Sequence, residues 1–378
     1  MWGQSLLGWE GGRKRLLNNL NTQEVKMPEL LSNVIEMIKP LDRGAMAKAR
    51  ARQDILTKPQ GSLGKLEELS IQLAGIQGKP IPQIRHKAIV TMAGDHGVVA
   101  EGVSLFPQEV TAQMVYNFLR GGAGINVIAR QAGARIIVVD IGVASDLEPN
   151  PQLLSRKVAF GTQNMALGPA MTREQAERAI ETGIGVVADE VAKGLDIVGT
   201  GDMGIGNTTA SSAICAVMTG KPVAEVTGRG TGIADEQLVH KIEVINRALA
   251  VNHPDPGQPF DVLAKVGGFE IGGLAGVMLA AAAHRIPIVI DGFISGAAAL
   301  IAIALSPKVR GFLIAGHVSA EAGHRLLLRH LGLKPLLDLG MRLGEGTGAA
   351  LGIFLAEVAA KVLAEMSTFD EAGVSERR

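Results

Sequence analysis

The sequence has very little cysteine, few aromatic side chains and no net charge. Its 378 residues include one cysteine, Cys215, which excludes an internal disulfide framework and favours a reducing, cytoplasmic setting with Cys215 as a packing residue. Lys and Arg number 37, as do Asp and Glu, so the formal net charge is +0. A neutral chain has no general field that gathers nucleic acid or anionic lipid. We therefore expect neither kind of partner, and recognition by a local site.

The N-terminal segment lacks the charged, apolar and small-residue regions of a secretory signal. Both tryptophans, Trp2 and Trp9, lie there, apart from the periodic body of the chain. We expect residues 1–26 to be a loose extension, with Met27 as a candidate start. The longest apolar run begins at Ile286, but proline, glycine and polar residues interrupt it. It predicts a strand, a turn and a buried helix, and no membrane crossing.

The body of the chain repeats one unit, in which a short apolar run is followed by a turn and a longer helical pattern. This alternation predicts an α/β fold, a Rossmann-like parallel sheet with helices on both faces. The clearest runs are KAIVTMAGDHGV from Lys87, ARIIVVDIGV from Ala134, LDIVGTGDMG from Leu195, IPIVIDGFISG from Ile286 and GFLIAGHVSA from Gly311. Ligands of such sheets bind beyond the carboxyl ends of the strands. The polar residues expected to border one crevice there are Asp95, Asp202, Asp291 and Ser319.

The two ends of the chain differ from this body. Residues 27–80 carry apolar residues at helical spacing, and a helical pattern that ends near Met366 follows Pro335. We expect segments 27–80 and 334–378 to form a small helical domain beside a large domain of residues 81–333. Clefts commonly form at such a junction.

The loop GTGDMGIGNTTASSAI contains a formal GxGxxG at Gly199, Gly201 and Gly204. One interpretation is a dinucleotide site and an NAD-dependent dehydrogenase. That signal is weak, because the acidic residue required about 20 positions later falls in a segment with a proline and no clear strand. Binding of a bare phosphate or ribose by Gly204, Gly206 and Asn207 fits better. A tight turn that binds nothing is the third interpretation.

A second glycine cluster, GRGTGIADEQLVHKI, places Arg229 beside Gly230 and reaches Lys241 at the end of the next helical pattern. Successive glycine amides with nearby cations are able to hold a phosphate. A solvated loop explains this cluster equally well when it is judged alone. Phosphate binding gains support because the two glycine loops follow one another along the predicted sheet edge.

The histidines do not form a metal motif. GHVSAEAGHRLLLRH has no pair at the spacing of a zinc-binding helix, so we expect no metal, and we expect most of these histidines to be on the surface or hydrogen-bonded. The segment DHG, from Asp95 to Gly97, is the histidine-containing segment that we expect to line the crevice. Its alternative is a turn with a structural aspartate.

The segment RLGEGTGAALG places Glu345 between Gly344 and Gly346 where a helix begins. A helix start has unpaired N–H groups and usually holds the anion of a ligand. The helix start lowers the pKa of a carboxyl group and burial in an apolar pocket raises it. The sequence leaves open which effect prevails.

These segments together resemble one enzyme family. The segments AGDHGVVAEGVSLFPQEVTAQMV, GDMGIGNTT, LAKVGGFEIGGLAGVMLAAA, DGFISGAAAL, GHVSAEAGH and MRLGEGTGAA are similar, in this order, to nicotinate-nucleotide:dimethylbenzimidazole phosphoribosyltransferases, which build the lower ligand of cobalamin. The resemblance covers about residues 40–365. It implies that nicotinate mononucleotide and 5,6-dimethylbenzimidazole give alpha-ribazole 5′-phosphate and nicotinate, without a cofactor. It also implies a homodimer with a large α/β domain and a small helical domain.

By this resemblance, Glu345 is the general base, which takes a proton from one ring nitrogen while the other attacks the ribose C1′ with inversion. Leu343 and Phe106 would line the benzimidazole pocket with Met114 near it, and Gly344 would let the flat base approach closely. The positions that match the ribose and phosphate of the nucleotide are Gly204, Asn207, Gly230, Lys241 and Ser319.

Three positions qualify this assignment. Asp202 stands where related sequences carry a second glutamate close to the base. Phe106 replaces a small polar residue of some members, which predicts tolerance for several benzimidazoles. Asp291 is expected at the crevice without a defined role. Besides the dehydrogenase, a non-catalytic nucleotide-binding protein remains as an alternative.

Overall fold

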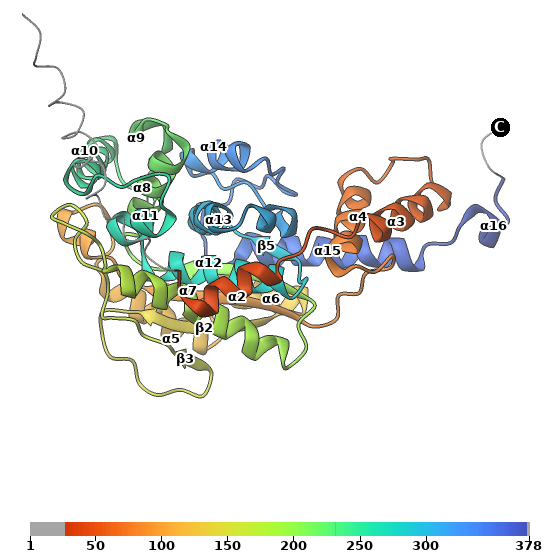
Figure 1. Ribbon diagram of the computed structural model, residues 1–378, viewed down its shortest axis with the longest axis horizontal. Helices are drawn as coiled ribbons and strands as arrows, with labels where there is room; N and C mark the ends of the chain where they lie inside the picture. Colours follow the sequence, from red (N-terminus) through yellow and green to blue (C-terminus); the bar gives the residue numbers. More distant parts are fainter. Residues whose placement is uncertain (1–26, 231, 376–378) are drawn as a thin grey trace, which may run out of the picture.

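The protein is described by a computed structural model that covers residues 27–230 and 232–375, so the expected extension, residues 1–26, lies outside the described part (Figure 1). The strands are β1 (Lys87–Gly94), β2 (Arg135–Gly142), β3 (Leu153–Ser155), β4 (Ile197–Met203), β5 (Ile288–Ile290) and β6 (Leu313–Ala315). The α-helices are α2 (Glu29–Met37), α3 (Arg43–Ile55), α4 (Lys65–Gln77), α5 (Glu109–Leu119), α6 (Gly124–Ala132), α7 (Arg173–Val191), α8 (Asn207–Thr219), α9 (Val223–Val226), α10 (Asp235–Asn252), α11 (Pro259–Val266), α12 (Phe269–Ala283), α13 (Phe293–Leu305), α14 (Ala322–Leu331), α15 (Thr347–Glu365) and α16 (Phe369–Ala372). Two 3-10 helices are η1 (Gly97–Glu101) and η2 (Pro307–Phe312).

The strands form one parallel sheet in the order β3-β2-β1-β4-β5-β6. This is the doubly wound order, in which the direction of winding reverses between β1 and β4. The predicted α/β fold is confirmed, and all five apolar runs are strands of this sheet. The sequence pattern does not predict β3, because this short edge strand has two half-buried leucines and no continuous apolar run.

Both faces of the sheet are covered, which explains the continuous apolar strands. Along β1, Ile89 and Ala93 face one apolar layer while Val90 and Met92 face the other, because side chains alternate along a strand. Helices α7, α12 and α13 belong to one layer, and α6 and α15 belong to the other. The apolar run that begins at Ile286 forms β5 and the buried part of α13, as predicted.

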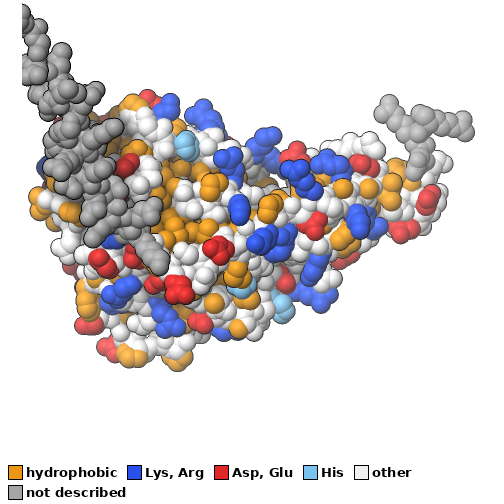
Figure 2. Space-filling model, in the orientation of Figure 1, with side chains coloured by type: hydrophobic (Ala, Val, Ile, Leu, Met, Phe, Trp, Pro, Cys, Tyr) orange, Lys and Arg blue, Asp and Glu red, His pale blue; other side chains and the backbone are white. Residues whose placement is uncertain are grey.

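Helix α15 connects the sheet to a projecting arm. It packs against β4 and β5 near its start and against α3 and α4 further along. Figure 1 shows α3, α4 and the end of α15 as an arm beyond the sheet, and Figure 2 shows Lys and Arg side chains along it. Helix α2 packs instead against α7 and α12. The helix predicted to end near Met366 ends at Glu365, whereas the boundaries of the small domain stay a prediction.

Among the described helices, α15 alone is long and apolar enough to cross a membrane. Its apolar window is 56% buried within the protein, and core helices pass the same test. Its contacts with the sheet and with helices α3, α4 and α6 account for this apolar surface.

Candidate active site

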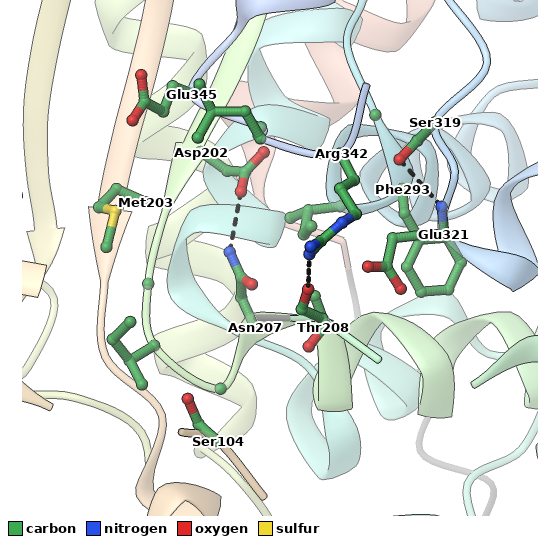
Figure 3. Close-up of a pocket in the computed structure, with 18 of the residues that line it drawn as sticks. Ser104, Asp202, Met203, Asn207, Thr208, Phe293, Ser319, Glu321, Arg342 and Glu345 are labelled. Carbon is green, nitrogen blue, oxygen red and sulfur yellow. Dashed lines mark hydrogen bonds between the residues drawn. The ribbon is translucent and has the colours of Figure 1, made fainter. Parts of the chain in front are cut away.

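A cavity of about 440 Å³ opens beyond the carboxyl ends of β4, β5 and β6. This is the edge of the sheet at which the sequence predicts a crevice. In Figure 3, Glu345 and Asp202 lie on one side of the cavity, and Arg342, Ser319 and Glu321 lie on the other. The predicted site residues that line it are Phe106, Met114, Asp202, Gly204, Gly206, Asn207, Gly230, Ser319, Leu343, Gly344 and Glu345.

The backbone around Glu345 adopts an unusual conformation. Gly344, Glu345 and Gly346 have φ angles of 82°, 65° and 99°, in the left-handed region that side chains disfavour. The Thr91 hydroxyl donates to the Glu345 carbonyl oxygen over 3.1 Å, which helps to hold this segment. A strained backbone persists only where surrounding contacts impose it, and such residues cluster at functional sites.

Asp291 supplies the contacts that impose this conformation. It follows β5, and its carboxylate accepts hydrogen bonds from the backbone N–H groups of Gly346 (3.0 Å), Gly348 (2.7 Å) and Ala349 (3.2 Å). The start of α15 is therefore occupied by an acid from the neighbouring strand, and not by Glu345 or a free anion site. Asp291 is fully buried and does not line the cavity, which differs from the expected place at the crevice.

The Glu345 carboxylate is hydrogen-bonded to the start of a different helix. Its Oε2 accepts a hydrogen bond from the backbone N–H of Ile125 over 3.0 Å, at the start of α6. Burial raises the pKa of Glu345 and the nearby Asp291 charge adds to this, while the Ile125 hydrogen bond opposes both. Burial therefore prevails, and the pKa of Glu345 lies above its usual range. A carboxylate with a raised pKa is a better proton acceptor, as a general base requires.

Asp202 lies beside this group at the end of β4. Its Oδ2 accepts from the Asn207 amide over 2.9 Å, and its Oδ1 has no hydrogen-bond partner among the described residues. Burial raises the pKa of Asp202 well above its usual range, and the charges of Asp291, Glu270 and Glu345 add to the effect. Burial and the neighbouring carboxylates therefore both disfavour the charged form of Asp202.

The GxGxxG pattern has a packing explanation in the structure. Gly199 and Gly201 lie within β4, and not in the loop that follows it. A Cβ atom on Gly201 would lie 2.3 Å from the Glu345 carbonyl oxygen, so only glycine lets this segment lie against the strand. Gly201 accommodates the Glu345 segment, and a pyrophosphate is not needed to explain it. The GxGxxG pattern, which was the main support for a dehydrogenase, is therefore explained by packing.

The opposite side of the cavity is built from the start of α8 and the second glycine cluster. Gly206 has a φ of 93°, and no side chain caps the helix that follows it. The Lys241 ammonium donates to the Thr208 hydroxyl over 2.8 Å and lies behind the cavity wall. Burial lowers the pKa of Lys241 to about 8. An uncapped helix start with a buried cation nearby is suited to a phosphate group.

Arg229 takes no part in the lining. Its guanidinium is about half exposed and forms an ion pair with Asp235. The cation that does line the cavity is Arg342, which donates to the Gly230 carbonyl oxygen over 2.9 Å. It directly precedes the LGEG segment, and its position in the sequence alone gives no sign that it reaches across to the glycine cluster.

Known proteins share both this sequence and this fold. A family model described as phosphoribosyltransferase matches residues 38–374. The chain is 63% identical over 350 residues to a nicotinate-nucleotide–dimethylbenzimidazole phosphoribosyltransferase of Desulforudis audaxviator, covering 93% of this chain and 99% of the relative. A Roseiflexus relative of the same name is 61% identical and covers 92% and 98%.

The chain belongs to this phosphoribosyltransferase family. A solved phosphoribosyltransferase of that name from Thermus thermophilus has a TM-score of 0.85 and 49% identity, over 89% of this chain and 100% of the other. The match from residue 38 onward includes every element that builds the cavity. The predicted family is therefore confirmed, and with it the class of enzyme.

One further expectation for this phosphoribosyltransferase is wrong. Asp95 and His96 do not line the cavity: Asp95 accepts from the Ala144 N–H over 2.8 Å, and His96 pairs with the buried Glu270 over 2.8 Å. This segment therefore has the structural role that was its alternative. Of the three histidines of the GHVSAEAGHRLLLRH segment, His330 is exposed and His324 accepts a hydrogen bond from Ser319, whereas His317 is 1% exposed and lines the cavity with its Nε2 3.5 Å from Asp291 Oδ1.

Proposed function

We propose that the protein transfers the phosphoribosyl group of nicotinate mononucleotide to 5,6-dimethylbenzimidazole, giving alpha-ribazole 5′-phosphate and nicotinate. These are the substrates that the names of its relatives state for them. The observation that carries the proposal is the division of the cavity in Figure 3, with a buried carboxylate on one side and a phosphate-binding arrangement on the other. A nucleotide held by its phosphate would direct its C1′ toward the carboxylate side.

Glu345 acts as the general base in this proposal. Its Oε1 has no hydrogen bond within the described residues and is left to accept the N–H proton of the azole. The other ring nitrogen then attacks C1′ from the face opposite nicotinate, which leaves, so the beta configuration becomes alpha. Positive charge that develops on the azole is compensated as its proton moves to the carboxylate.

Asp202 assists on the same side. Its shorter side chain keeps the hydrogen bond to Asn207, and its Oδ1 has no hydrogen-bond partner among the described residues. The neutral acid that burial favours avoids a second negative charge beside Glu345.

The azole pocket is apolar and open at its mouth. Phe106 and Leu343 are 50% and 59% exposed, and Met114 lines the cavity beside them. A flat aromatic base would cover these side chains on binding. Because the pocket is open, we expect several benzimidazoles to be accepted, and strict rejection of unsubstituted benzimidazole would contradict this expectation.

The proposal is tested by incubating the protein with nicotinate mononucleotide and dimethylbenzimidazole and following the products by chromatography and mass. We expect equal amounts of nicotinate and ribazole phosphate. Glu345→Gln keeps the size of the side chain but removes the base, so we expect turnover to fall by about 10²–10⁴-fold. Glu365→Gln, on the exposed end of α15, is the matched control and should be unaffected.

The other outcomes separate the alternatives. Nicotinate release without the riboside would indicate a hydrolase, and binding without any release would indicate a non-catalytic nucleotide-binding protein. Normal turnover of Glu345→Gln would remove Glu345 from the role of base. A titration with nicotinamide dinucleotide that shows no binding would dispose of the dehydrogenase.

We also propose that the protein is a cytoplasmic homodimer. Val127 of α6 and Phe354 of α15 are 56% and 46% exposed on helices that pack together, which leaves an apolar face beside the cavity. A second copy of the chain would cover this face. Light scattering should give the mass of a dimer, and Val127→Asp should shift it toward the monomer.

A further inference from the structure

Glu321 is a buried acidic residue of the cavity that has no role in the reaction proposed above. It directly precedes α14, its side chain is 7% exposed, and it lines the cavity. Its Oε2 has no hydrogen-bond partner within the described residues. In Figure 3 its carboxylate points toward the space between Arg342 and Thr208.

The structure leaves room for this carboxylate at a specific place. A Cβ atom on Gly228 would lie 1.9 Å from Glu321 Oε2, so any larger residue at position 228 would displace the acid. The Glu321 backbone N–H donates to the Ser319 hydroxyl over 3.3 Å, which fixes the start of the side chain. Oε2 is thus enclosed against Gly228, and Oε1, which has no hydrogen bond within the described residues, is the oxygen left to accept from a donor in the cavity.

Few groups of the nucleotide are able to donate a hydrogen bond to Glu321. Its phosphate and its pyridine carboxylate are anionic acceptors, which another carboxylate repels. The pyridinium ring carries no N–H, so the ribose hydroxyls are the remaining donors. The ribose must lie between the phosphate, at Thr208 and Lys241, and the base, Glu345, and the Glu321 carboxylate enters the cavity beside Thr208 and Arg342, where the ribose would join the phosphate (Figure 3).

We infer that Glu321 accepts a hydrogen bond from a ribose hydroxyl of the nucleotide, and so selects ribonucleotides over deoxyribonucleotides. This inference rests on the proposed function and adds a residue that determines its specificity. A site built to bind a hydroxyl group rejects analogues that lack it, because its own polar group is then left unpaired.

A simpler role for Glu321 is to act as a counter-charge for Lys241. The charge of Glu321 does favour the protonated form of that lysine. The two roles differ in what they predict, because a counter-charge affects every phosphate-bearing nucleotide equally, whereas a hydroxyl acceptor affects the ribonucleotide most.

The test measures kcat/KM with nicotinate mononucleotide and its 2′-deoxy and 3′-deoxy forms for the wild type, Glu321→Ala and Glu321→Gln. We expect the wild type to disfavour at least one deoxynucleotide by about 10²-fold. Glu321→Ala should lose about the same factor with the ribonucleotide and bring the three substrates within about threefold of one another. Glu321→Gln keeps an acceptor oxygen and should retain part of the discrimination. Glu243→Ala, on the exposed side of α10, is the control.

Each result bears on the inference. Equal use of all three nucleotides by the wild type would overturn it, as would an equal loss for all three in Glu321→Ala. If Glu321→Ala does not fold, an undiminished preference for the ribonucleotide in Glu321→Gln would overturn it instead. Failure of the wild type to form any ribazole phosphate would contradict the proposed function, and not this inference.

Discussion

Two helix starts on opposite sides of the cavity have the same local form and opposite occupants. Helices α8 and α15 each follow a left-handed glycine, Gly206 with a φ of 93° and Gly346 with a φ of 99°, so neither cap residue has a side chain that could bond to the helix. At α15, Asp291 occupies the N–H groups from the strand next door. At α8, no side chain of the described residues occupies the N–H groups, and the helix start faces the cavity.

This difference shows that the occupant of a helix start, and not the start itself, decides its role. An internal carboxylate at α15 excludes a ligand phosphate and holds the residue before the helix, Glu345, in position. The open start at α8 remains available to the phosphate of the nucleotide. One helix thus organises the base and the other binds the substrate.

The largest effect is expected from removing the internal acid. Asp291→Ala leaves three buried N–H groups without their acceptor, and a buried donor without a partner costs about 1–3 kcal/mol. We expect the free energy of unfolding to fall by several kcal/mol and kcat to fall with it. Asp42→Ala removes the side-chain cap of α3, far from the cavity, and is the matched control.

Chemical denaturation and steady-state kinetics on both variants make this comparison. Asp42→Ala should lose about 1 kcal/mol of stability and no activity. Unchanged kcat in a folded Asp291→Ala would show that the α15 start does not position Glu345.

The second largest effect is expected at the start of α8, where we propose that the phosphate binds. Lys241→Met removes the buried cation behind Thr208 while keeping an unbranched side chain. We expect KM for the nucleotide to rise by about 10–100-fold, because a charged hydrogen-bond donor to the phosphate is lost, with a smaller change in kcat. Kinetics with saturating azole separate the two constants. An unchanged KM would place the phosphate elsewhere.

The fold was predictable from the sequence because its signal is local. The central strands β1, β2 and β4 each contain a short apolar run and are therefore visible in the sequence, whereas the edge strand β3 is not. The site was predictable where a residue lies in its own motif, as Glu345 does between its glycines.

The partners of the site residues were not predictable, since they come from distant segments. Asp291 is more than fifty residues before the helix that it caps, and Ile125 is 220 residues from the carboxylate that it binds. Arg342 reaches Gly230 across 112 residues. No local pattern encodes these pairings, which only the doubly wound order of the strands brings about.

A third, smaller effect is expected from replacing the glycine that precedes each helix. Gly206→Ala and Gly346→Ala place a Cβ atom in similar surroundings, 2.7 Å from Val99 Cγ2 and 2.7 Å from Ile89 Cγ2. A left-handed backbone costs an alanine about 1–2 kcal/mol, so both variants carry comparable strain. We expect Gly206→Ala mainly to raise KM for the nucleotide, and Gly346→Ala mainly to lower kcat, each by about tenfold.

Gly220→Ala supplies the control for strain alone, since this glycine has a φ of 67° and no atom within 4 Å of the added Cβ position. The same kinetic change in Gly206→Ala and Gly346→Ala would erase the distinction between the two helix starts.

The smallest effect is the pH dependence of kcat/KM, whose acid limb we assign to Glu345 and whose alkaline limb we assign to Lys241. Burial raises the pKa of Glu345, so the base is lost as the pH falls, and the acid limb of kcat/KM should lie above that of an ordinary glutamate. Burial lowers the pKa of Lys241 to about 8, so the cation is lost as the pH rises, and the alkaline limb should lie near pH 8. Lys241→Arg keeps its charge over this range and should move the alkaline limb upward without moving the acid limb. A profile in which both limbs shift together in Lys241→Arg would mean that the two sides of the cavity titrate as one coupled group, and that the α8 and α15 starts do not act separately.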